Sequence, residues 1–115
     1  MNSYKATARR RKQSTIAQTE KRWQQAQIIA QKASNFLKQE YGEVEVILFG
    51  SSTQRDRFHL HSDIDLAIKG LPPEHFFKVV AQLQDLSPEF QVDLVQLEYC
   101  QNSLHQLILE EGKPL

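Results

Sequence analysis

Hydrophobic residues recur with two different periods along this chain, and the periods divide it into helices and strands. Between Ser14 and Tyr41 the apolar positions follow steps of three, four and seven, the spacing of one helix face. We expect this helix to begin at Ser14 or Thr15, which can cap its first turn, and to end before Gly42. Its predicted apolar stripe consists of Ile16, Trp23, Ala26, Ala30, Ala33, Leu37 and Tyr41.

Three short segments are rich in β-branched and aromatic residues, as strands are. They span residues 44–49, 62–69 and 90–97. In the middle segment, alternate residues point to opposite faces, and only one of the two faces is wholly apolar. The apolar set is Ile64, Leu66 and Ile68, and the opposite set is Asp63, Asp65 and Ala67.

Two further amphipathic segments predict helices between and after these strands. One opens at Pro72-Pro73 and ends before Ser87-Pro88, and the other spans about residues 101–111. The residues expected to face the core are Phe76, Val79, Val80, Leu83 and Leu86 in the first, and Leu104, Leu107 and Ile108 in the second. The alternation of helices and strands predicts an α/β (α+β) fold with a small mixed sheet of about three strands flanked by helices.

The composition is typical of one compact domain. Of 115 residues, 40% are hydrophobic and 24% charged, which is enough apolar material for a core. We assign residues 14–115 to a single domain and residues 1–13 to a basic, flexible leader. No apolar run approaches the roughly 18 residues that a membrane-spanning helix needs, so no membrane partner is expected. The single cysteine, Cys100, cannot form an internal disulfide, which favours a cytoplasmic setting.

Charge is distributed unevenly, although the formal net charge is zero. Residues 1–22 hold seven basic residues and one acid, whereas the rest of the chain holds seven basic and thirteen acidic residues. A basic leader can bind nucleic acid or an acidic partner, or it can be a solvated tail. No aromatic residue lies within the basic cluster Arg9–Lys12, as a single-strand stacking platform requires, so nucleic acid is the less favoured partner.

Gly50 follows the first predicted strand directly, in the sequence Phe49-Gly50-Ser51-Ser52. A glycine lets the backbone approach a ligand closely, and the free amides of the following turn, together with the Ser51 hydroxyl, can bind phosphate oxygens. A Gly-Ser pair at the end of a strand is more often an ordinary turn. The pair therefore indicates a phosphate site only in combination with other features.

Asp63 and Asp65 lie two residues apart on the polar face of the second predicted strand. Residues i and i+2 are roughly 6.5–7 Å apart along a strand, so both carboxylates can reach the same one or two cations. Oxygen ligands alone select a hard ion, so Mg²⁺ is the expected metal and Mn²⁺ the alternative. The other interpretation is a solvated strand edge with both acids in water.

Asp93 lies in the middle of the third predicted strand, in the run Val92-Asp93-Leu94-Val95. A carboxylate among apolar strand residues is costly without a partner. If the third strand lies beside the second, Asp93 can join Asp63 and Asp65 on one face. Three acids beside a phosphate-binding turn form a two-metal arrangement, in which cations activate a hydroxyl and neutralise a triphosphate.

Together these motifs resemble the nucleotidyltransferase superfamily and, within it, the minimal nucleotidyltransferases. Members share a strand, a Gly-Ser pair, roughly ten residues, an Asp-x-Asp pair and a third Asp on a later strand. Here Gly50-Ser51 is followed by eleven residues, then by Asp63-Ile64-Asp65, and later by Asp93. The resemblance covers about residues 20–115 and implies a polymerase β-like fold.

The resemblance also implies roles for individual residues. Gly50 and Ser51 would bind the phosphates of the nucleotide. Asp63 and Asp65 would hold two divalent ions. Asp93 would help to bind the catalytic ion and would take the proton from the attacking hydroxyl.

The turn after the Gly-Ser pair departs from the family pattern. Many members continue with a small residue and Ala-Arg-Gly, whereas this chain continues Ser52-Thr53-Gln54-Arg55-Asp56. We include Ser52 and Arg55 among the nucleotide-binding residues. Arg57 is the other candidate for a phosphate contact, and both arginines can equally be surface residues.

The resemblance finally implies a Mg²⁺-dependent enzyme with ATP as its substrate. Many minimal members are antitoxins of HEPN-domain toxins, and some transfer AMP to a toxin tyrosine. We therefore expect an antitoxin that transfers AMP from ATP to a hydroxyl of a HEPN-type toxin and so neutralises it. The alternative is a non-catalytic antitoxin that occludes its partner.

Overall fold

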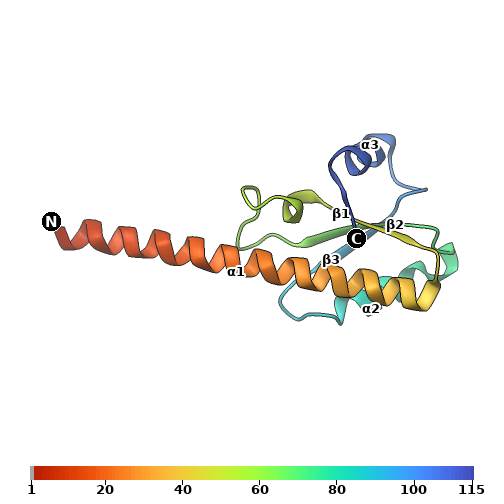
Figure 1. The fold of residues 1–115 in the computed structure, drawn as a ribbon, viewed down its shortest axis with the longest axis horizontal. Coiled ribbons are helices and arrows are strands. Elements are labelled where there is room, and N and C mark those ends of the chain that lie inside the picture. Colours follow the sequence, from red (N-terminus) through yellow and green to blue (C-terminus); the bar gives the residue numbers. More distant parts are fainter. Residues whose placement is uncertain (1) are drawn as a thin grey trace.

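The computed structural model describes the backbone of residues 2–115 and the side chains of residues 15–115. A long helix and two shorter helices flank a mixed sheet (Figure 1), which confirms the predicted α/β fold class. The elements follow in the order α1 (Asn2–Tyr41), β1 (Glu45–Phe49), η1 (Gly50–Thr53), β2 (Ile64–Lys69), η2 (Pro73–His75), α2 (Phe76–Gln84), β3 (Val92–Gln96), α3 (Asn102–Glu111) and β4 (Lys113–Pro114).

The sheet has four strands in the order β3-β2-β1-β4. Strand β1 is antiparallel to both of its neighbours, whereas β2 and β3 are parallel. The fourth strand was not predicted, because it consists only of Lys113 and Pro114 and so has no alternation to detect. Its position at the edge of the sheet is one where a proline, which lacks an N–H, is tolerated.

Helices α1 and α2 cover one face of the sheet, and α3 covers the other (Figure 1). The alternation predicted for the strands is confirmed, because each set of alternate residues lies in a different apolar cluster. The strand residues under α1 and α2 are Val46, Leu48, Ile64, Leu66, Ile68, Val92 and Leu94. Those packed with Ile108 and Leu104 of α3 are Ile47, Phe49, Ala67 and Val95.

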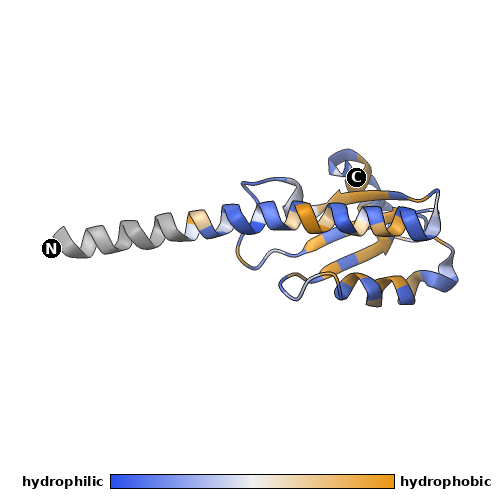
Figure 2. Ribbon diagram, turned by 60° about the horizontal axis from the view of Figure 1, so that its bottom comes forward, coloured by the Kyte–Doolittle hydropathy of each residue, from blue (hydrophilic) through white to orange (hydrophobic). Residues whose placement is uncertain are grey.

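Helix α1 begins at Asn2, well before the predicted start at Ser14 or Thr15. Residues 2–41 contain no glycine or proline, so nothing in the chain breaks the helix. Its first half therefore projects beyond the sheet (Figure 1). Figure 2 shows hydrophilic and hydrophobic residues following one another along the part of α1 that lies over the sheet. The side chains of the basic cluster Arg9–Lys12 lie outside the described residues.

The apolar stripe of α1 is shorter than predicted. Ile16 is 60% exposed, because the helix at this point has passed the edge of the sheet. The buried part of the stripe consists of Ala26, Ala30, Ala33 and Leu37. Alanines bring the helix axis close to the strands, which places the polar residues of α1 within reach of the loops at the sheet edge.

The other two helices differ from the prediction in detail. Helix α2 is preceded by the short 3₁₀ turn η2, and its buried residues are Val79 and Leu83. In α3, Ile108 is buried as expected, but Leu107 is 42% exposed, because α3 turns the face of Leu104 and Ile108 to the sheet and adjacent helix residues are about 100° apart. None of the described helices combines the length and the apolar composition that spanning a bilayer requires.

Candidate active site

Gly50 forms the turn that follows β1, and its missing side chain makes room for Asp65. Its φ of +79° lies in the left-handed region, which glycine adopts readily and other residues rarely do. A Cβ atom built on Gly50 would lie 2.5 Å from Oδ2 of Asp65. The Asp65 carboxylate is therefore adjacent to the backbone of the turn for which phosphate binding was predicted.

Asp65 and Asp93 are neighbours across the parallel strands β2 and β3. The register pairs the two residues directly, so their side chains lie on the same face of the sheet, on strands about 4.8 Å apart. Burial raises the pKa of Asp65 above its ordinary value, and the negative charges of Asp93 and Asp63 raise it further. The three acids singled out in the sequence are therefore close enough to interact electrostatically.

The three carboxylates differ in exposure. Asp63 and Asp65 are half-buried, whereas Asp93 is exposed and accepts a 2.9 Å hydrogen bond from the side-chain amide of Gln91. Although its neighbours in the sequence are apolar, the Asp93 side chain itself therefore lies at the surface. Strand β3 is an edge strand, and its Asp93 side chain lies on the face opposite to the one that carries Val92 and Leu94 under α1 and α2.

The two serines after Gly50 lie in different surroundings. Ser51 is half-buried at the surface of the turn. Ser52 is fully buried, its hydroxyl donates to the carbonyl of Phe49 at 3.4 Å, and its own carbonyl accepts a 2.7 Å hydrogen bond from Gln27. The Ser52 side chain therefore holds the turn together from inside, and the assignment of Ser52 to nucleotide binding stays a prediction.

Arg55 and Arg57 are both more than half exposed, and each pairs with an acid elsewhere in the chain. Arg55 lies 3.2 Å from Glu20 of α1, and its guanidinium carbon is 4.6 Å from the centre of the Trp23 ring. Arg57 lies 3.5 Å from Glu111 of α3. Exposed ion pairs of this kind contribute little to stability, so the observed pairing neither requires nor blocks a phosphate contact.

Residues 31–115 match the family described as polymerase beta, nucleotidyltransferase. The chain belongs to this nucleotidyltransferase family. The match includes Gly50, Ser51 and all three acids, and it confirms the superfamily that the motif spacing indicated.

Several solved toxin–antitoxin structures share the fold of this nucleotidyltransferase and confirm its resemblance to the minimal members. A complex with AMP-PNP contains a chain 26% identical to it, with a TM-score of 0.62, over 74% of this chain and 70% of that chain. A double aspartate-to-glutamate mutant of MntA–HpeT gives 25% identity and a TM-score of 0.61 over the same shares.

A third structure shows likeness in fold alone. It contains the tri-AMPylated HEPN toxin of Shewanella oneidensis with an MNT antitoxin, and it matches at 24% identity and a TM-score of 0.59, over 77% of this chain and 70% of that chain. Among proteins with curated descriptions, none matches this nucleotidyltransferase.

The residues present fit a divalent cation in their chemistry. Asp63, Asp65 and Asp93 offer oxygen ligands only, and burial, followed by the negative charges of Asp93 and Asp63, raises the pKa of Asp65. In the described part of this nucleotidyltransferase, however, no three Asp, Glu, His or Cys side chains are grouped tightly enough to hold an ion as they stand. Binding a cation would therefore require the exposed Asp93 side chain, or its neighbours, to adjust.

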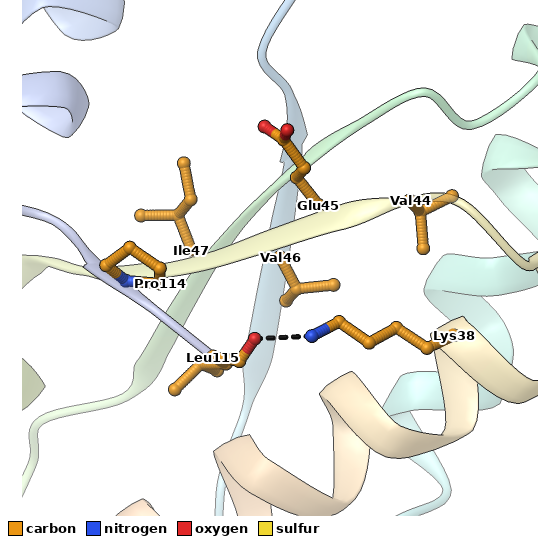
Figure 3. A pocket seen from close by; sticks show the side chains of 7 residues that line it. All are labelled: Lys38, Val44, Glu45, Val46, Ile47, Pro114 and Leu115. Carbon is orange, nitrogen blue, oxygen red and sulfur yellow. Dashed lines mark hydrogen bonds between the residues drawn. The ribbon is translucent and has the colours of Figure 1, made fainter.

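A cavity of about 360 Å³ lies elsewhere in this nucleotidyltransferase, at the start of β1 and beside β4 (Figure 3). In it, Nζ of Lys38 donates a 2.5 Å hydrogen bond to the main-chain oxygen of Leu115. Gly50 lies at the opposite end of β1, and none of the predicted site residues lines the cavity. Cavity volume alone would therefore have pointed away from the acids.

Sequence reasoning missed one contribution of α1 to the site. Gln27 is half-buried and donates to the carbonyl of Ser52, two residues after Gly50. The signal that could have revealed it is position, since Gln27 directly follows Ala26 in the buried stripe. A polar residue at the margin of such a stripe is well placed to contact a loop.

Proposed function

We propose that this nucleotidyltransferase is an antitoxin that transfers AMP from ATP to a tyrosine hydroxyl of a HEPN-type toxin. The observation that carries the proposal is the pairing of Asp65 with Asp93, next to the turn at Gly50, in a chain of this family. The nucleotide analogue in one similar complex, and the AMPylated toxin in another, support ATP as donor and a protein as acceptor.

In this proposal each residue has one task. The backbone amides after the left-handed Gly50 and the Ser51 hydroxyl bind phosphate oxygens, as the amides of a glycine turn can. Asp63 and Asp65, with Asp93, would hold Mg²⁺ ions, or Mn²⁺, which when bound supply charge neutralisation at the triphosphate. Asp93 accepts the proton of the attacking hydroxyl, since it is the exposed carboxylate of the three.

The transfer step balances as an in-line displacement. The hydroxyl oxygen of the acceptor forms a bond to the α-phosphorus of ATP. At the same time, the bond breaks between that phosphorus and the oxygen that bridges the α- and β-phosphates. Pyrophosphate leaves, and the hydroxyl proton passes to Asp93. The acceptor gains one AMP group.

The experiment is transfer of label from α-labelled ATP to a co-purified HEPN toxin in the presence of Mg²⁺. We expect the native chain to label the toxin and the Asp63→Asn/Asp65→Asn variant to lose labelling by at least about 100-fold. Asp85→Asn, which changes an exposed carboxylate after α2, is the matched control and should label normally. Undiminished labelling by the double variant would refute the transferase assignment.

Occlusion of the partner is the second candidate, and the exposed apolar side chains of the described surface favour it. Phe77 is 83% exposed, and Ile28, Tyr99 and Leu109 are also largely exposed. Aromatic side chains such as Phe77 and Tyr99 are enriched in protein–protein interfaces. If the Asp63→Asn/Asp65→Asn variant loses labelling but still neutralises the toxin, occlusion carries the biological effect.

A further inference from the structure

Arg22 of α1 contacts both chain segments that lead into the acid-bearing strands. One terminal nitrogen of its guanidinium donates hydrogen bonds to the carbonyl oxygens of Ser62 and Glu89, each at 3.2 Å. The guanidinium carbon also lies 4.0 Å from the centre of the Phe90 ring, which is a cation–π contact. Ser62 directly precedes Asp63, and Glu89 and Phe90 precede β3. A single side chain therefore joins the start of β2 to the start of β3.

The two joined segments determine where the acids lie. Beyond them, the N–H of Ile64 donates a 3.0 Å hydrogen bond to the carbonyl of Gln91, and the parallel register that follows places Asp65 beside Asp93. A slip of one residue in this register would turn Asp93 to the opposite face of the sheet. The alignment of β2 and β3 at their first residues therefore decides whether Asp93 lies on the same face as Asp65.

We infer that Arg22 is a positioning residue, which fixes the start of β2 against the start of β3 and thereby holds Asp63 and Asp65 beside Asp93. Its charged donor strengthens hydrogen bonds to neutral carbonyls, and neither bond uses a carboxylate of the acidic cluster. The flat guanidinium covers the Phe90 ring while it donates its two hydrogen bonds. A lysine side chain could donate hydrogen bonds here but could not cover the ring in the same way. Because it acts through the backbone, Arg22 touches no substrate in this role.

The structural part of the inference is tested by amide hydrogen exchange of the whole chain. The Ile64 amide reports the start of the β2–β3 pair, and the Leu97 amide, bonded to the carbonyl of Ile68 at 2.9 Å, reports its other end. We expect Arg22→Met to accelerate exchange at Ile64 by about tenfold and to leave Leu97 within about twofold. Equal acceleration at both amides, or none at Ile64, would overturn the inference, because a general loss of stability affects both ends alike.

Two further variants complete this experiment. Lys21→Met removes the neighbouring exposed cation and should change neither amide. Arg22→Lys retains a charged donor and should restore part of the Ile64 protection. If Arg22→Met does not fold, Arg22→Lys alone decides: an Ile64 amide that exchanges faster relative to Leu97 supports the inference, and an unchanged ratio overturns it.

The catalytic consequence rests on the proposed function. In AMP transfer, we expect Arg22→Met to lower kcat by about 100-fold, because misplaced reacting groups cost about this much, with KM for ATP changed by less than about threefold. Altered exchange with an unchanged kcat would overturn the positioning role. If the native chain transfers no AMP at all, the proposed function fails, and the exchange measurement still decides whether Arg22 aligns the two strands.

Discussion

The two faces of the sheet show how this domain separates stability from chemistry. The face under α1 and α2 is apolar along the strands, and most of its side chains are fully buried. The face under α3 is apolar in the middle, where Ala67 packs near Ile108, but acidic at the end where Asp65 and Asp93 lie. Because β2 supplies alternate residues to both faces, residues adjacent in sequence have unrelated tasks. Acids on one face can therefore be replaced without disturbing the core on the other.

The largest expected effect comes from Leu66, which directly follows Asp65 in β2 but points to the opposite face of the sheet. Its side chain is fully buried under α1 and α2. Leu66→Ala should lower the free energy of unfolding by about 2–5 kcal/mol, because it removes buried apolar contacts and leaves a cavity. Asp93→Ala, on the opposite face and exposed, should change it by less than about 0.5 kcal/mol. Urea unfolding of both variants measures the contrast, and similar losses would break the comparison.

The next effect concerns Gly50, where backbone strain and the acidic cluster meet. Gly50→Ala should cost about 1–2 kcal/mol for a left-handed alanine. It should also abolish AMP transfer, since the added Cβ displaces the Asp65 carboxylate. Gly42→Ala is the matched control: its φ is +74°, but no atom lies within 4 Å of an added Cβ. It should cost similar stability in urea unfolding and transfer AMP normally, and equal loss of transfer in both variants would contradict the steric argument.

A smaller effect is expected from the pH dependence of Asp65. Its pKa is raised in the folded state, so the folded chain binds this proton more tightly than the unfolded chain does. The stability associated with the proton is present below the ordinary pKa of 3.8 and is lost as pH rises through the raised pKa. As pH rises through this range, the free energy of unfolding should therefore fall less steeply for Asp65→Asn than for the native chain. At pH 7, without added metal, the substitution should not lower the free energy of unfolding.

Urea midpoints across this pH range test the Asp65 prediction. Asp85→Asn serves as the control, because its exposed carboxylate lies outside the cluster. Stability curves of the native chain and Asp65→Asn that run parallel from pH 3 to pH 7 would show that neither burial nor the charges of Asp93 and Asp63 raise the pKa of Asp65.

The smallest effect is expected where an ion pair joins exposed side chains. Arg57→Gln removes the 3.5 Å pair with Glu111 and should change the free energy of unfolding by less than about 0.5 kcal/mol. Thermal unfolding of this variant beside Leu66→Ala places the exposed and the buried contribution on one scale. A loss above about 1 kcal/mol would mean that α3 depends on this contact.

Local patterns in the sequence were sufficient for the faces of the strands and for the acid-bearing positions. Alternation of two residues is a property of any single strand, so the division between Leu66 and Asp65 followed without knowledge of the neighbours. The turn at Gly50 could also be predicted from the sequence, because a glycine after an apolar run marks a turn. The sequence could not predict that Asp93 is exposed and Ser52 buried, because both depend on which elements lie above those residues.

By itself, then, the sequence determined which side chains share a face, where the chain turns, and which family its motifs belong to. Tertiary structure decided that β2 and β3 run parallel with Asp65 opposite Asp93, that Lys113 and Pro114 add a fourth strand, and that Arg22 joins two distant loops. The physical reason is the separation in sequence between the residues that interact. Periodicity and turn chemistry act over a few neighbouring residues, whereas strand pairing and contacts between helix and loop join residues tens of positions apart, and only packing of the whole chain selects among them.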